Sequence, residues 1–137
     1  MTDWNEFNRQ VIDEFRANDG SVGGTFAGAP MILVNHQGAK SGKAYTTPLV
    51  FTRDGENYVI IASKGGAPAD PEWFHNLRAH PDVTIEVGAD SVPVRARVAE
   101  GEERTRLYRA QADLMPNFDE YAKATTREIP VVVLEPR

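Results

Sequence analysis

The segment that follows the apolar run at residues 60–62 carries the residue types of an anion-binding site. It reads Ser63-Lys64-Gly65-Gly66, and Trp73 follows closely. Glycines let backbone N–H groups approach a ligand, and successive N–H groups in a turn can form a nest that binds an anion. Lysines supply point charges for a phosphate, and an indole can pack against a planar ring. The segment therefore predicts one wall of a site for a flat, anionic ligand.

A second segment offers the same chemistry. Lys40, Ser41 and Lys43 stand in the glycine-bounded stretch 38–43, between two predicted strands. Pro71 can open a helix, and the first turn of that helix adds free N–H groups. Each feature also has an ordinary reading: a lysine as a solvated surface residue, a glycine pair as a plain turn, a tryptophan as core. It is their combination that indicates a binding site.

Familiar catalytic motifs are missing from the sequence. The stretch 38–43 is one residue short of a nucleotide-triphosphatase loop, and a predicted strand follows it instead of a helix. There is no G-x-G-x-x-G and no G-x-S-x-G. His36, His75 and His80 lack metal-binding spacing, so we expect surface or edge histidines and no metal site.

Length and composition favour one domain, residues 1–137, with one core. The absence of cysteine excludes disulfides and thiolate catalysis, and it fits the cytoplasm. The net charge of −5 disfavours nucleic acid as a partner. No apolar stretch is long enough to predict a transmembrane segment. The N-terminal apolar stripe predicts a helix that packs on the core rather than a membrane anchor, although peripheral membrane association is left open.

The elements that must position these residues alternate along the chain. The patterns predict an N-terminal helix that stops at residues 18–20, and further helices at 71–80, 102–115 and 117–126. They predict six strands, at 31–38, 46–53, 57–63, 82–88, 91–100 and 129–136. Asp54-Gly55 is a hairpin signal, and Pro48 indicates an edge strand or a bulge. Short links make most strand pairs antiparallel, which gives an α+β fold.

Several stretches together carry a family resemblance from Asn18 to the end of the chain: "NDGSVGGTFAGAP", "GAKSGKAYTTPL", "ASKGGAPADPEWFHNLRAHPDV", "EERTRLY", "PNFDEY" and "TTREIPVVVLEP". The pattern resembles the deazaflavin-dependent nitroreductases, also described as quinone reductases dependent on coenzyme F-420. The resemblance implies a split β-barrel and hydride transfer from the reduced coenzyme to a quinone, a nitroaromatic or an activated enone. A bound coenzyme that supplies the hydride also accounts for the missing triad and metal site.

The resemblance also implies roles for residues. Lys40 matches a cation near the coenzyme phosphate. Tyr45 replaces a residue that is often basic in the family, so phosphate binding is expected to depend more on Lys40, Lys43 and Lys64. Ser63 and Tyr121 are the candidates for proton delivery, with solvent as the alternative; Tyr121 is the hydroxyl left in "MPNFDEY". The full coenzyme-binding set is Lys40, Ser41, Lys43, Pro48, Ala62, Ser63, Lys64, Gly65, Gly66, Trp73 and Asn76.

Three other readings stay open at this point. The chain could be a flavin mononucleotide (FMN) enzyme of the same barrel class, or a carrier that binds deazaflavin without turnover. It could also be a structural dimerisation domain whose glycines only form turns. The sequence is compatible with a monomer or a homodimer.

Overall fold

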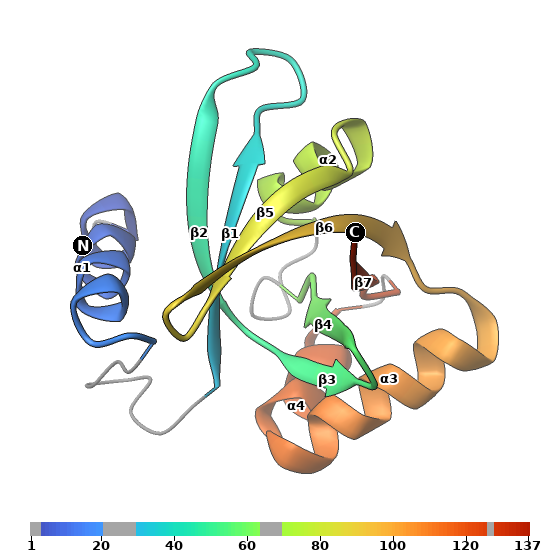
Figure 1. Cartoon of the computed structure of the whole chain (residues 1–137). Coiled ribbons are helices and arrows are strands. Elements are labelled where there is room, and N and C mark those ends of the chain that lie inside the picture. The colour runs from blue at the N-terminus through green and yellow to red at the C-terminus, as the bar shows by residue number, and fades with distance from the viewer. Residues whose placement is uncertain (1–3, 21–29, 64–69, 126–127) are drawn as a thin grey trace.

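The computed structural model describes residues 4–20, 30–63, 70–125 and 128–137, with side chains from Asn8 onward. Helices and strands alternate much as the sequence predicts (Figure 1). The helices are α1 (Trp4–Ala17), α2 (Glu72–Ala79), α3 (Gly101–Leu114) and α4 (Asn117–Ala124). The strands are β1 (Met31–Gln37), β2 (Ala44–Val50), β3 (Thr52–Asp54), β4 (Asn57–Ile61), β5 (Asp82–Val87), β6 (Asp90–Val98) and β7 (Val131–Pro136). None of these described helices combines the length and the apolar character that a bilayer crossing requires.

The described strands form one antiparallel sheet in the order β2-β1-β5-β6-β7-β4-β3. Its two edge strands, β2 and β3, are consecutive in the chain and separated only by Phe51. Because one short stretch of chain supplies both edges, the sheet has to curl until they nearly meet, which produces the half-barrel seen in Figure 1. The α+β split-barrel fold expected from the sequence is therefore confirmed.

The prediction of six strands was short by one. Residues 46–53 read as a single strand, but Phe51 leaves the ladder, and its N–H donates to the carbonyl of Pro30 at 3.2 Å. The break lets the chain leave the β1 side of the barrel and pair with β4. Pro48 lies on β2, which is an edge strand as predicted, and it pairs with Leu33 of β1. A proline is tolerated at this position because only one side of the strand is paired.

Alternate residues of β4 and β7 separate two cores. Ile60 and Val132 face one core, which also contains Phe74 and Leu77 of α2. Neighbouring residues of the same strands face a second core together with α3 and α4: Val59, Ile61, Val131, Val133, Leu107, Tyr108, Ala112 and Phe118. The period-two alternation of a strand thus places α2 on one side of these strands, and α3 with α4 on the other.

Helix α1 belongs to neither core. Val11 and Phe15 pack with Met31 and Leu33 in a third, smaller cluster beside β1 and β2. Figure 1 shows α1 standing to one side of the half-barrel. The N-terminal stripe was expected to pack on the core, and its described side chains are buried in this separate cluster instead of in the two larger cores.

Candidate functional site

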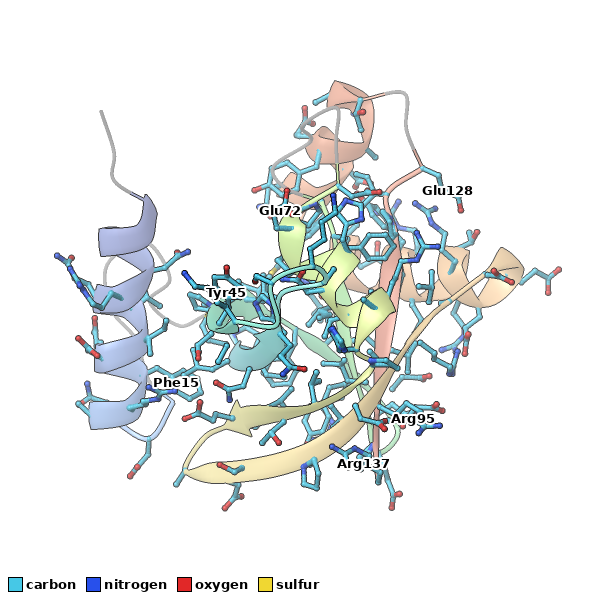
Figure 2. The ribbon with its side chains drawn as sticks, turned by 90° about the horizontal axis from the view of Figure 1, so that it is seen from above. Phe15, Tyr45, Glu72, Arg95, Glu128 and Arg137 are labelled. Carbon is cyan, nitrogen blue, oxygen red and sulfur yellow. The ribbon has the colours of Figure 1, made fainter. Side chains whose placement is uncertain are left out.

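A groove of about 1840 Å³ lies between α1, the β1–β2 hairpin and α2. Helix α1 forms one wall, the turn at residues 38–43 forms the rim, and the first half of α2 forms the opposite wall. In Figure 2, Tyr45 of the hairpin lies between α1 and the end of α2 that carries Glu72. The lining residues are Asn8, Arg9, Ile12, Asp13, Arg16, His36, Gly38, Ala39, Lys40, Ser41, Ala44, Tyr45, Thr46, Thr47, Glu72, Trp73, His75 and Asn76.

The β1–β2 turn that presents Lys40 is tightly closed. The N–H of Gly38 donates to the carbonyl of Lys43 at 2.8 Å, and the N–H of Gly42 donates back to Gly38 at 3.0 Å. Ser41 Oγ accepts from the N–H of Lys43 at 3.2 Å. A Cβ on Gly38 would lie 2.5 Å from Ser41 Oγ and 3.2 Å from the Tyr45 ring, so a side chain here would displace the Ser41 hydroxyl from its place in the turn. As a result, Lys40 and Ser41 are exposed on a turn of defined shape.

A chain of buried polar groups joins this turn to α2 and β2. Asn76 Oδ1 accepts from the N–H of Ala39 at 2.9 Å. Asn76 Nδ2 lies 3.0 Å from His36 Nδ1, and His36 Nε2 lies 2.8 Å from Thr47 Oγ1. Asn76 and His36 are both buried. Burial lowers the pKa of His36 below its ordinary value.

Two aromatic side chains face the groove from different elements. Tyr45 is 46% exposed, and its ring stacks on His36 with centroids 5.7 Å apart at an interplanar angle of 25°. Trp73 is 7% exposed and belongs to the core that contains Phe74. Trp73 therefore presents only a small edge to the groove, and it is held there by core packing.

The structure gathers four of the coenzyme-binding residues predicted from the sequence in this groove. Lys40 and Ser41 come from the hairpin turn, and Trp73 and Asn76 come from α2. Lys43 is exposed on the same turn but does not line the groove. Lys64, Gly65 and Gly66 lie outside the described residues.

The other predicted residues lie elsewhere on the sheet. Ala62 and Ser63 are buried where β4 ends, and the N–H of Ala62 donates to Pro130 at 2.9 Å. Pro48 is half-buried on β2. None of these three is among the groove-lining residues.

Tyr121 packs on the second core. Its ring meets Phe118 edge to face at 5.2 Å between centroids, and its hydroxyl oxygen accepts from Asn117 Nδ2 at 2.8 Å. Tyr121 is likewise not among the residues that line the groove. The structure therefore does not bring Tyr121 to this groove, and its role in proton delivery stays a prediction.

One expectation about the histidines was wrong. His36 is 7% exposed on β1, an interior strand, whereas a surface or edge position was expected. The pattern itself contained the signal, because Ile32, Val34 and His36 alternate onto one face of the strand and the first two are core residues. Tyr45 and the wall supplied by α1 were not predicted as parts of the site either. Among the described residues, no three His, Asp or Glu side chains are grouped to hold a metal ion.

The groove suits a long, flat, anionic ligand. Its volume exceeds the roughly 300–1,000 Å³ of pockets for drug-sized ligands, which leaves room for a ring system and a tail. Arg9, Arg16 and Lys40 bring positive charge to it, against Asp13 and Glu72. Arg16 is also paired with Glu86 at 2.8 Å, and that hydrogen bond lowers the pKa of Glu86.

The curled antiparallel sheet with its four described helices is a split-barrel-like fold. The family model described as F420H(2)-dependent quinone reductase matches residues 7–136, and the chain belongs to this family. The cofactor is therefore coenzyme F-420, and the reaction is hydride transfer from its reduced form to a quinone.

Relatives and solved structures agree with this assignment. The F420H(2)-dependent quinone reductase Rv1261c of Mycobacterium tuberculosis H37Rv is 41% identical over 127 residues, which is 90% of this chain and 85% of the relative. A structure described as an F420-H2 dependent reductase, FDR-A, is 38% identical with a TM-score of 0.72, over 77% of this chain and 94% of that chain. Another structure, described as a domain-swapped dimer, is 35% identical with a TM-score of 0.74, and the match covers 96% of this chain and 97% of that chain.

Proposed function

We propose that the groove between α1, the β1–β2 turn and α2 is the coenzyme F-420 site of this quinone reductase. One observation carries the proposal: Lys40, Ser41, Trp73 and Asn76 come from two separate segments of the chain, and they line the same groove. When bound, the reduced coenzyme supplies the hydride.

The chain's own residues bind and orient the coenzyme. Lys40 is exposed at the rim and supplies a point charge for the phosphate, with Lys43 on the same turn as a second cation. Ser41 offers a hydroxyl beside them. Trp73 is immobilised by the core, so its edge forms a fixed wall, and Tyr45 adds an exposed ring opposite α1. A wall that is already rigid loses little entropy when the ligand binds.

The remaining predicted residues are proposed to contact the deazaflavin ring. We assign Pro48, Ala62 and Ser63 to the ring side, together with Lys64, Gly65 and Gly66. Pro48 lies on β2, whose Tyr45, Thr46 and Thr47 line the groove, so the ring would continue along the strand that carries the rim.

The acceptor class extends from quinones to nitroaromatics and activated enones, and the reduced acceptor needs a proton. Ser63 and Tyr121 are the proposed donors, with solvent as the alternative. The Tyr121 oxygen already accepts a hydrogen bond from Asn117, so its own proton is available to a third group. A hydroxyl in this arrangement is suited to donate rather than to accept.

The test is a fluorescence titration with oxidised coenzyme F-420. A hydrogen bond to a charged group contributes about 1.5–3 kcal/mol, so Lys40→Ala should raise the Kd about ten- to a hundredfold. Lys123→Ala is the matched control, because Lys123 is an exposed lysine on α4 that pairs only loosely with Glu120 at 3.7 Å. An unchanged Kd in Lys40→Ala would place the coenzyme phosphate elsewhere.

Two further measurements address the remaining readings. Turnover of menadione by the protein with reduced coenzyme separates a reductase from a carrier. Titration with FMN should show much weaker binding than with coenzyme F-420, and tight FMN binding would contradict the proposal.

We propose that residues 1–137 act as one domain in the cytoplasm, as a monomer or a homodimer. The similar structure described as a domain-swapped dimer supports testing the second possibility. Sedimentation velocity across a range of protein concentrations distinguishes the two states.

A further inference from the structure

A single buried side chain connects α2 to the turn that carries Lys40. Asn76 Oδ1 accepts from the backbone N–H of Ala39, the residue before Lys40, at 2.9 Å. A backbone N–H can only donate, so the carbonyl oxygen of the Asn76 amide has to face it. The opposite end of the amide, Nδ2, then has to face His36 Nδ1, which lies 3.0 Å away.

This orientation determines the state of His36. Asn76 Nδ2 carries only donor hydrogens, so His36 Nδ1 has to be an unprotonated acceptor. A neutral imidazole with a bare Nδ1 carries its proton on Nε2, and this nitrogen lies 2.8 Å from Thr47 Oγ1. The Nε2–H therefore donates to Thr47 on β2. The complete chain runs from Thr47 through His36 and Asn76 to Ala39.

We propose that His36 is a positioning residue for coenzyme binding: as the neutral Nε2–H tautomer, it holds the Asn76 amide in the orientation that fixes Ala39 and the Lys40 turn at the groove. This inference rests on the proposed coenzyme site, because Lys40 is the group being positioned. It also gives Asn76 a specific task. The Asn76 side chain is 6% exposed and already bonded at both ends, so it orients the turn rather than contacting the ligand.

Protonation of His36 would break the chain. A second ring proton on Nδ1 would point at the Asn76 Nδ2 hydrogens, and two donors cannot bond to each other. The amide would have to rotate and release Ala39, so coenzyme affinity should fall as His36 becomes charged. The other charged or titratable groups that line the same groove are Arg9, Asp13 and Arg16 on α1, Lys40 on the turn, Tyr45 on β2, and Glu72 and His75 on α2.

Variants at His36 separate its contribution from that of its neighbours. His36→Asn places a carbonyl oxygen close to the position of Nδ1, so it keeps the acceptor for Asn76 but cannot titrate. His36→Leu removes the acceptor. Losing one neutral hydrogen bond corresponds to about a three- to tenfold weaker Kd for oxidised coenzyme F-420 at pH 8. His36→Asn should bind more tightly than His36→Leu at pH 8 and should lose less affinity than the unmodified protein between pH 7 and pH 5.

Asn76→Asp should remove the pH dependence that comes from His36. A carboxylate accepts from Ala39 N–H, and it accepts from His36 Nδ1–H both in the charged ring and in the neutral Nδ1–H tautomer, whose Nε2 can accept from Thr47, so the turn would be held at either pH. The affinity of this variant should rise relative to Asn8→Asp as pH falls from 8 to 5.5. Asn8→Asp is the matched control, because it adds the same charge to the groove from α1 without touching the chain of hydrogen bonds.

Nitrogen-15 NMR of the histidine rings tests the idea without any coenzyme. The ligand-free protein at pH 7 should show His36 as the Nε2–H tautomer, and the Ala39 amide should be protected from exchange in the unmodified protein but not in His36→Leu. A Nδ1–H tautomer would overturn the inference. The inference would also be overturned if His36→Leu is folded and binds coenzyme as tightly as the unmodified protein, while the separate variant Lys40→Ala binds it weakly. If Lys40→Ala also binds coenzyme normally, the proposed coenzyme site is wrong. The NMR experiment then still tests the tautomer of His36 and its link to Ala39.

Discussion

Phe15 is the residue that should fasten α1, and therefore one wall of the groove, to the barrel. Its side chain is 1% exposed, and it packs with Val11, Met31 and Leu33 in a cluster separate from the two larger cores. Figure 2 shows Phe15 extending from α1 toward the sheet. Replacing a buried phenylalanine with alanine costs about 3–5 kcal/mol. A 14-residue helix is only marginally stable by itself, so a loss of this size should undock and fray α1 while the barrel stays folded.

The consequence for binding follows from the fraction of molecules with α1 docked. If less than a tenth of Phe15→Ala molecules keep α1 docked, coenzyme affinity falls by about tenfold or more, because the apparent Kd scales inversely with that fraction. Phe15→Leu, which keeps most of the buried apolar side chain and should cost less than Phe15→Ala, is the conservative control.

Hydrogen exchange followed by mass spectrometry measures the two regions separately. In Phe15→Ala, residues 8–17 should lose protection while β5, β6 and β7 keep theirs. The reasoning is refuted if α1 and the sheet lose protection together, because α1 would then be part of one cooperative unit. It is equally refuted if α1 keeps its protection or if a frayed α1 leaves coenzyme affinity unchanged.

Three further outcomes are expected. Tyr121→Phe should bind coenzyme normally but reduce menadione about ten- to a hundredfold more slowly if Tyr121 delivers the proton, as measured by steady-state rates at saturating reduced coenzyme. Gly20→Ala should lower the melting temperature more than Gly55→Ala: both glycines have positive φ, but only a Cβ on Gly20 meets another backbone, 2.8 Å from the Cα of Gly88. Finally, burial lowers the pKa of His36, so the unfolded chain binds this proton at a higher pH than the native state does. The urea midpoint should therefore fall as pH drops below about 6.5, and His36→Asn should reduce that fall.

Much of the fold could be predicted because its signals are local. Alternating apolar residues marked the strands, Asp54-Gly55 marked the β3–β4 hairpin, and Pro48 marked an edge strand; all three predictions are confirmed. The break at Phe51 could not be predicted in this way. Phe51 still bonds to Pro30, directly before β1, whereas Thr52 already pairs with Val59 of β4. The break therefore marks the point where the chain changes its partner strand, and no short-range pattern reports which strand that partner is.

The candidate site residues also differ in whether a local sequence signal reveals them. Lys40 and Ser41 were found because a polar, glycine-bounded turn between strands is visible in the sequence. The contribution of α1 was not, because an apolar stripe predicts that a helix packs but does not predict which strands receive it. His36 was misjudged because a single histidine was read by residue type alone, although its alternation with Ile32 and Val34 indicated burial.

The groove is assembled from three elements that are held in place by different contacts. Helix α1 depends on the small cluster around Phe15, the β1–β2 turn depends on Asn76, and α2 depends on the main core through Phe74 and Leu77. Only the last of these is part of the barrel's own packing. Changes at the first two fastenings can therefore alter coenzyme affinity with little effect on the stability of the barrel, since distant sites without shared partners act additively. Combining Phe15→Ala with His36→Leu should accordingly change the free energy of coenzyme binding by the sum of the two separate effects, and a clear departure from that sum would show that α1 and the turn move as one unit.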